Sequence, residues 1–212
     1  MLHRDQYGGT AIIALGRLCN VITSIGQDTT GLGRWTWLCL HSQGGPTTFV
    51  VSTYFPHRTI RKQSFKTVEY QHSLYYQSQG DFRPPCQIFQ EDLLNMIRPW
   101  QEKGYKVVLG IDANQNVYNG PLAKALGDAP FFMNCLIKET LGCPVPNSHH
   151  RGTEPITTIF GLPGLVTDHA ICFPHWYGLG DHRLFVIEVA SASLFGGRYP
   201  SIGRPGGRLL NC

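Results

Sequence analysis

Compact runs of apolar residues early in the chain predict β-strands. Residues 10–15 (TAIIAL) form a continuous apolar run, which is typical of a buried strand. Residues 34–40 (RWTWLCL) and 47–55 (TTFVVSTYF) are rich in β-branched and aromatic side chains, which favour strands. The Gly-Gly-Pro sequence at 44–46 separates these two runs and indicates a turn. We therefore expect the second and third runs to form a β-hairpin.

After Pro56 the spacing of apolar residues changes to that of helices. Residues 58–77 are polar with scattered apolar positions, as on an exposed helix. Residues 87–100 place four apolar side chains at helical spacing, namely Phe89, Leu93, Ile97 and Trp100. This pattern predicts a second helix with one buried face.

The second half of the chain alternates short strands and helices. Residues 105–112 (YKVVLGID) are apolar on both faces and end at an acid, which favours a strand in a covered sheet. Further strands are expected at 156–162, 169–173 and 184–190, and short helices at 121–128 and 132–142. Strands in hairpin-like order with inserted helices predict an α/β (α+β) fold. We expect a four-layer sandwich, in which two mostly antiparallel sheets pack face to face with helices outside.

Composition limits the class of protein. The chain has 212 residues, of which 42% are hydrophobic and 15% charged, as in globular domains. Its formal charge of +4 is too small to indicate a polyanionic partner by itself. The seven cysteines include no CxxC pair, which favours a reducing compartment. With no signal peptide and no bilayer-spanning stretch, we expect an intracellular protein, nuclear or cytoplasmic, without a membrane partner.

The charge pattern divides the chain into two parts. Residues 1–190 are expected to form one folded domain. Residues 191–212 are rich in glycine and arginine and contain no acid, so they are expected to be a flexible basic tail.

Two polar pairs stand at the ends of predicted strands. Asp112 ends a buried strand and Asn114 follows two residues later, so both side chains would point the same way, with oxygens suited to a hard cation. A simple turn after the strand is the alternative. Asp181 and His182 precede an apolar strand, where a carboxylate can orient an imidazole or stabilise its charge. For an isolated Asp-His pair, a purely structural role is the favoured interpretation.

A zinc site is a weaker hypothesis. Cys135, Cys143, His149 and His150 follow each other at a spacing that matches no standard structural zinc site. Scattered thiols and a polar loop are the favoured interpretation.

Taken together, four stretches resemble the endonuclease/exonuclease/phosphatase family, which includes DNase I and the apurinic endonucleases. They are "GGTAII", "VVSTYFPH", "VVLGIDANQNV" and "LGDHRLFVIEV", and their order and spacing match the family from about Gly8 to Ala190. Within the family, "RGTEPITTIF" followed by "GDHR" is most similar to the endonuclease domains of retroelement polyproteins.

The resemblance implies a role for five residues. Asp112 and Asn114 would hold the attacking water and contact the phosphate, with Asp112 near the metal. His182 would hydrogen-bond or protonate a phosphate oxygen, and Asp181 would bind the metal or orient the site. Tyr54 would contact the phosphate. The implied reaction is attack of water on a phosphate ester assisted by Mg²⁺, or by Mn²⁺ as the alternative ion.

The sequence also departs from the family pattern. The family's metal-binding Glu has no counterpart, because no Glu precedes Glu69, and the chain therefore resembles a family member that lacks its first strands. Thr157 stands where the family has an Asp, although Asp168 is a rival for that position, and His57 replaces an Asn. We expect metal binding to be weakened or lost, activity to be low or absent, and the fold to be only marginally stable.

Three functions follow from these patterns. The leading one is a divergent, degenerate metal-dependent endonuclease of retroelement type, whose ancestral substrate is DNA. The alternatives are an inactive relic that binds nucleic acid, and a phosphatase that acts on a small phosphorylated substrate.

Overall fold

The computed structural model describes residues 8–57, 67–178 and 180–196 of the chain, which contain two β-sheets and five α-helices. The strands are β1 (Ile22–Gln27), β2 (Trp35–His41), β3 (Thr47–Tyr54), β4 (Lys106–Asp112), β5 (Asn134–Cys135), β6 (Thr157–Gly161), β7 (Thr167–Cys172) and β8 (Phe185–Val189). The helices are α1 (Val68–Ser78), α2 (Pro85–Glu102), α3 (Pro121–Gly127), α4 (Leu136–Leu141) and α5 (Ser191–Phe195), with 3₁₀ turns η1 (Gly16–Val21) and η2 (His175–Tyr177).

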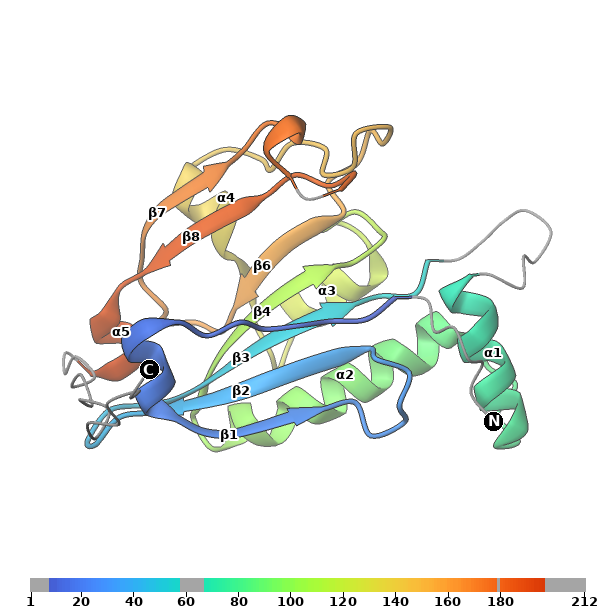
Figure 1. Cartoon of the computed structure of the whole chain (residues 1–212), viewed down its shortest axis with the longest axis horizontal. Coiled ribbons are helices and arrows are strands. Elements are labelled where there is room, and N and C mark those ends of the chain that lie inside the picture. Colours follow the sequence, from blue (N-terminus) through green and yellow to red (C-terminus); the bar gives the residue numbers. More distant parts are fainter. Residues whose placement is uncertain (1–7, 58–66, 179, 197–212) are drawn as a thin grey trace, which may run out of the picture.

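The larger sheet has the strand order β1-β2-β3-β4-β6-β5, and the smaller sheet pairs β7 with β8 (Figure 1). Among the strand pairs of the described residues, β3–β4 is parallel and the others are antiparallel. The predicted α/β class with two mostly antiparallel sheets is therefore confirmed, as is the β2–β3 hairpin.

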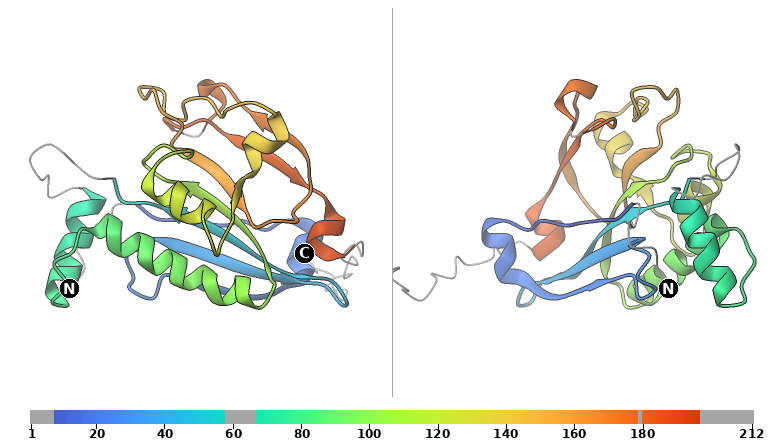
Figure 2. Two further views of the ribbon diagram at one scale, coloured as in Figure 1. Left: turned by 180° about the vertical axis from the view of Figure 1, so that it is seen from behind. Right: turned by 45° about the vertical axis from the view of Figure 1, so that its right-hand side comes forward.

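The main core lies between the larger sheet and α2. Alternate residues of β3 and β4 point to one face, where Val51 and Leu109 are buried with the apolar side of α2. Figure 2 shows α2 lying along this face of the sheet. The predicted second helix is confirmed and extends beyond its predicted ends. Of the predicted helix at 58–77, the part in α1 is confirmed, and residues 58–66 lie outside the described residues.

The prediction of a buried strand at residues 10–15 was wrong. This segment has no regular structure, and its side chains Ile13 and Leu15 are 82% and 77% exposed. Ile12 and Ala14 pack instead against a small cluster that contains Leu40. The apolar pattern arises because every second side chain is partly buried, while the backbone joins neither sheet.

The smaller sheet stands apart from the larger one (Figure 2). Helix α4 contacts both β6 and β7 and so connects the two sheets. A cleft of about 370 Å³ opens between them, lined by β3, β4 and β6 on one side and by Leu184 and Phe185 on the other. Within the described residues β8 pairs with β7 alone, so its second edge has no strand partner.

The described structure continues past the predicted end of the folded domain at residue 190. Helix α5 follows β8, and its Phe195 is buried with Val21 and Leu38. The hydroxyl of Ser42 donates to the carbonyl of Phe195. Apolar side chains at 194 and 195 therefore dock this start of the predicted tail, whereas residues 197–212 lie outside the described residues.

Among the helices of the described ranges, not one has the length and hydropathy needed to cross a lipid bilayer.

Candidate active site

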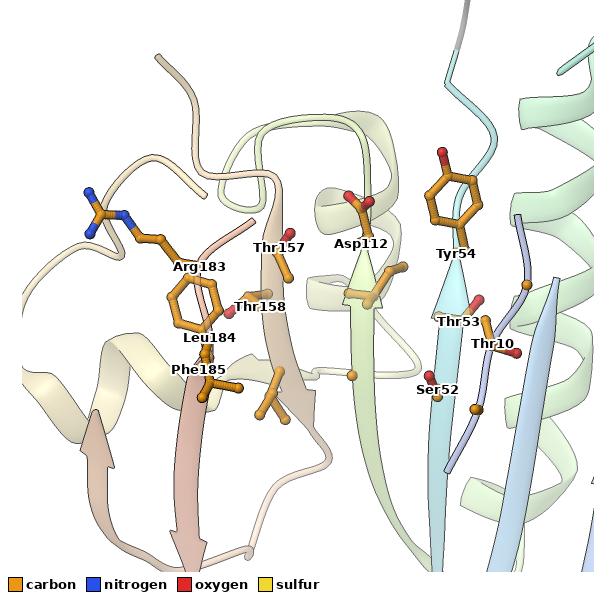
Figure 3. A pocket seen from close by; sticks show the side chains of 15 residues that line it. Thr10, Ser52, Thr53, Tyr54, Asp112, Thr157, Thr158, Arg183, Leu184 and Phe185 are labelled. Carbon is orange, nitrogen blue, oxygen red and sulfur yellow. The ribbon is translucent and has the colours of Figure 1, made fainter. Parts of the chain in front are cut away.

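Strand register brings three hydroxyl and carboxyl groups together at one end of the larger sheet. Tyr54 pairs with Asp112 across β3 and β4, and Asp112 pairs with Thr157 across β4 and β6. Directly paired residues of neighbouring strands point to the same face. Figure 3 shows the three side chains side by side at the strand ends, and all three line the cleft.

Asn114 closes the turn after β4. Its φ of 47° lies in the left-handed region, which Asn tolerates better than most residues. Its backbone N–H donates to Asp112 Oδ1 over 3.3 Å, and its side-chain Nδ2 donates to the carbonyl of Phe55 over 2.7 Å. Its side chain also hydrogen-bonds with Tyr54. Asn114 thus forms the turn and also contacts two residues of the candidate site. The interpretation as a turn and the interpretation as a site therefore do not exclude each other.

Two loops that are distant in sequence are joined above Asp112. His149 and His182 form an antiparallel β-bridge. The N–H of His150 donates to the carbonyl of Asp181, and the N–H of Arg183 donates to that of Ser148. Residues opposite each other between two such bonds have closely spaced side chains on one face. The two imidazole rings accordingly lie with centroids 5.3 Å apart.

Buried Ser148 and two glycines fix this arrangement. Ser148 Oγ accepts hydrogen bonds from the N–H groups of Ile156 and Thr157, which anchors the first loop to β6. A side chain at Gly178 would collide with the carbonyl oxygen of His182, and Gly180 has a φ of +106°. Glycine at these positions permits the close turn that directs Asp181 and His182 towards β6.

His182 lies at the centre of the site. Its Nδ1 is 3.0 Å from Thr157 Oγ1, and its Nε2 is 3.9 Å from Asp112 Oδ2 and 4.0 Å from Asp181 Oδ1. The imidazole thus presents Nε2 to two carboxylates while a hydroxyl holds its other nitrogen. The partner of Nδ1 is thus an uncharged hydroxyl.

The two carboxylates have different environments. Burial raises the pKa of Asp112, and the charge of His182 and the N–H of Asn114 offset this only in part. Burial also acts to raise the pKa of Asp181, but its backbone hydrogen bond and its bond from His149 outweigh burial and lower it. Burial raises the pKa of Tyr54. Asp112 is therefore the carboxylate of the pair that is better suited to accept a proton.

Sequence reasoning missed His149. Its Nε2 lies 3.1 Å from Asp181 Oδ2, and ligand atoms of His149, Asp181 and His182 all lie within 4.8 Å of one another. The zinc hypothesis had grouped His149 with cysteines, but Cys143 is exposed and Cys135 contacts Thr158 instead. The sequence signal for His149 was the His-His pair in a polar loop. Only the fold shows that Asp181 and His182 face this pair.

The five residues predicted for the site are all brought together, namely Tyr54, Asp112, Asn114, Asp181 and His182. Asp168 lies on exposed β7 in the smaller sheet, whereas Thr157 contacts His182. Asp112 and Asp181, which were predicted as metal ligands, supply the two carboxylates nearest to His182 in the described part of the chain. By donor chemistry the two carboxylates suit a divalent cation, because Mg²⁺ commonly takes one or two carboxylates and retains several waters.

Solved structures with a similar arrangement identify the fold. An endonuclease/exonuclease/phosphatase from Bacteroides vulgatus superposes with a TM-score of 0.53 at 15% identity, covering 79% of this chain and 65% of that one. This chain has the endonuclease/exonuclease/phosphatase fold.

The human Nocturnin catalytic domain with bound sulfate anion (TM-score 0.49, 15% identity) covers 78% of this chain and 59% of that chain. The Xenopus laevis APE2 catalytic domain (TM-score 0.46, 14% identity) covers 79% and 59% respectively. The chain with this fold thus spans less than two thirds of the length of each of the three structures. No family model matches the sequence, and no curated protein matches it.

Proposed function

We propose that this chain is a divergent, weakly active phosphodiesterase domain of the retroelement endonuclease type, whose substrate is DNA. The observation that supports this most is the convergence of Tyr54, Asp112 and His182 at one end of a sheet pair with the endonuclease/exonuclease/phosphatase fold. The order of motifs from Gly8 to Ala190 supports the same function.

In the proposed reaction, each side chain has a role that its position permits. Asp112, which lines the cleft, accepts the proton of the attacking water. Nε2 of His182 faces the same space and donates a hydrogen bond to a phosphate oxygen. Asn114 holds Asp112 and Tyr54 in place, and the Tyr54 hydroxyl contacts the phosphate.

The proposed cation is Mg²⁺, bound at Asp112 and Asp181. When bound, it stabilises negative charge that develops on the phosphoryl oxygens. The Asp181 side chain is 62% exposed, and only Asp112 is well enclosed. A site with few enclosed oxygen ligands is expected to bind a hard cation weakly.

Low activity follows from Thr157. Its hydroxyl can position His182 Nδ1 but adds no negative charge to stabilise the imidazolium. Charge stabilisation and orientation of this kind are commonly worth orders of magnitude in rate. The proposed enzyme is thus a slow one.

A plasmid-nicking assay with Mg²⁺ and a large excess of protein tests this function. Wild type should nick slowly, and Asp112→Ala should lower the rate by about 100-fold or more because it removes the proton acceptor. A rate that is unchanged in Asp112→Ala would overturn the proposal.

The chain carries its own matched control. Asp168 and His169 repeat the Asp-His pair on exposed β7, outside the site. His182→Ala should abolish nicking, while Asp168→Ala and His169→Ala should retain it. Inositol phosphates provide the second substrate arm: faster release of phosphate from these than nicking of DNA would favour the phosphatase alternative.

A further inference from the structure

We propose that His149, Asp181 and His182 form a binding site for a transition-metal ion, of which Zn²⁺ is the representative. The site lies on the two bridged loops at the mouth of the cleft. The inference goes beyond the proposed function and does not depend on it, because an ion can bind here whether or not the chain hydrolyses phosphate esters. The two uses of Asp181 and His182 are alternative states: an ion at this site takes Nε2 of His182 in its unprotonated form and excludes both the proposed Mg²⁺ at Asp181 and the hydrogen bond to phosphate.

The distances between the three ligand groups suit one ion. His149 Nε2 and Asp181 Oδ2 are 3.1 Å apart, His182 Nε2 and Asp181 Oδ1 are 4.0 Å apart, and all three groups offer ligand atoms within 4.8 Å. Ligand atoms at bonds of about 2 Å around a tetrahedral ion lie between roughly 3 and 4 Å apart. Small side-chain rotations therefore suffice to bring the three groups onto one centre.

The backbone holds the ligands in place before an ion arrives. The bridge between His149 and His182 fixes the two imidazoles on the same face, and the carbonyl of Asp181 accepts from His150. Thr157 Oγ1 contacts His182 Nδ1, so a proton on Nδ1 leaves the lone pair of Nε2 directed at the ion. A hydrogen bond to the second nitrogen is the usual support for a metal-binding histidine.

His149 must change its tautomer to bind. The N–H of Arg151 donates to His149 Nδ1, which places the ring proton on Nε2, where it donates to Asp181. Metal binding through Nε2 moves this proton to Nδ1 by exchange with water, and the Arg151 N–H turns to solvent. Arg151 is exposed, so its N–H loses one protein contact and gains water in exchange.

The ligand chemistry selects the ion. Two imidazoles and one carboxylate suit Zn²⁺, Co²⁺ or Mn²⁺, whereas Mg²⁺ prefers an all-oxygen shell. Three protein ligands leave further positions for water. Asp112 Oδ2, 3.9 Å from His182 Nε2, stands close enough to hydrogen-bond such a water.

Titration with Zn²⁺ in the presence of a competing chelator, on the full chain without a histidine tag, tests the site. We expect one ion per chain and no displacement by a large excess of Mg²⁺. Because loss of a supporting hydrogen bond costs roughly 10- to 100-fold in affinity, loss of the ligand in His149→Ala should cost about 100-fold or more, and Thr157→Val roughly 10-fold or more.

His150→Ala is the matched control, since it removes the adjacent imidazole, whose Nε2 accepts from Arg151 Nε, and leaves the ligands intact. Its affinity should stay within about 3-fold of wild type. Replacement of Zn²⁺ by Co²⁺ should give visible d–d absorption of low-symmetry coordination in wild type and in His150→Ala, but not in His149→Ala.

Three results would overturn the proposal: no stoichiometric binding by wild type, equal loss of affinity in His149→Ala and His150→Ala, or displacement of Zn²⁺ by equimolar Mg²⁺. Circular dichroism of each variant checks that the fold is retained. Because none of these measurements involves catalysis, failure of the metal site and failure of the proposed hydrolase can be distinguished.

Discussion

At the residue scale, Asp112 is placed at a cost to stability. Its carboxylate is largely enclosed, and burial raises its pKa above the ordinary value for Asp. A raised pKa in the folded state means that the folded chain binds a proton more readily than the unfolded chain. Stability from this group therefore rises as the pH falls towards its folded pKa, and the ionised form opposes folding at neutral pH.

Asp112→Asn removes this charge while it keeps the shape of the side chain. We expect the free energy of unfolding at pH 7 to increase by roughly 1 kcal/mol, which is within the range of single stabilising substitutions. Urea denaturation measures the change. Asp168→Asn, on exposed β7, should leave the midpoint unchanged, and a loss of stability in Asp112→Asn would show that its contacts outweigh its desolvation.

Individual site residues could be predicted where strand ends and short motifs carry the chemistry. Asp112 and His182 stand next to apolar runs, and both were found from the sequence. His149 could not be found, because it reaches the site through a bridge to a loop that lies 33 residues away in sequence (182 − 149 = 33). The roles of these residues in catalysis stay predictions.

At the element scale, α1 is attached by a buried polar network. Arg34 pairs with buried Asp28 and donates to the hydroxyl of Tyr76 on α1. His72 of α1 is buried beside this network, and burial together with the charge of Arg34 lowers its pKa from 6.5 to about 4. His72 is therefore neutral at physiological pH.

Acidification should loosen this helix. Between about pH 6.5 and 4 the unfolded chain takes up a proton at His72 that the folded chain excludes, so stability falls as the pH falls, by roughly 3 kcal/mol over this window. Unfolding free energies measured across the window should fall less steeply for His72→Gln than for wild type. Parallel curves for the two proteins would contradict this assignment.

Elements with a strong local pattern could be predicted, and those defined by distant partners could not. The hairpin of β2 and β3, the helix α2 and the strand β4 follow from β-branched runs and helical spacing. Residues 10–15 have the same apolar character as these strands but join no sheet. Sheet membership depends on a neighbouring backbone, which local sequence does not specify.

At the scale of the whole molecule, the smaller sheet leaves apolar side chains exposed. Val186 on β8 faces solvent, as does its partner Ile171 on β7. The second edge of β8 lacks a strand partner in the described residues. Such an edge favours association between chains.

Val186→Lys should reduce this association. Light scattering from concentrated protein should decrease. The free energy of unfolding should stay within about 0.5 kcal/mol of wild type, because the position is exposed. Glu188→Gln, on the same exposed side of β8, removes a charge and should increase scattering. Equal scattering of all three proteins would show that association occurs elsewhere.

The pairing of His149 with His182 also affects the order in which this molecule loses function and structure. It connects the loop before β6 with the loop before β8, so the candidate site is also a point of contact between the parts of the chain that carry the two sheets. A slight separation of the two loops would break the contact between Thr157 and His182 before any strand lost its pairing. Loss of function would then be the earliest sign of damage, in a chain whose secondary structure still looked intact.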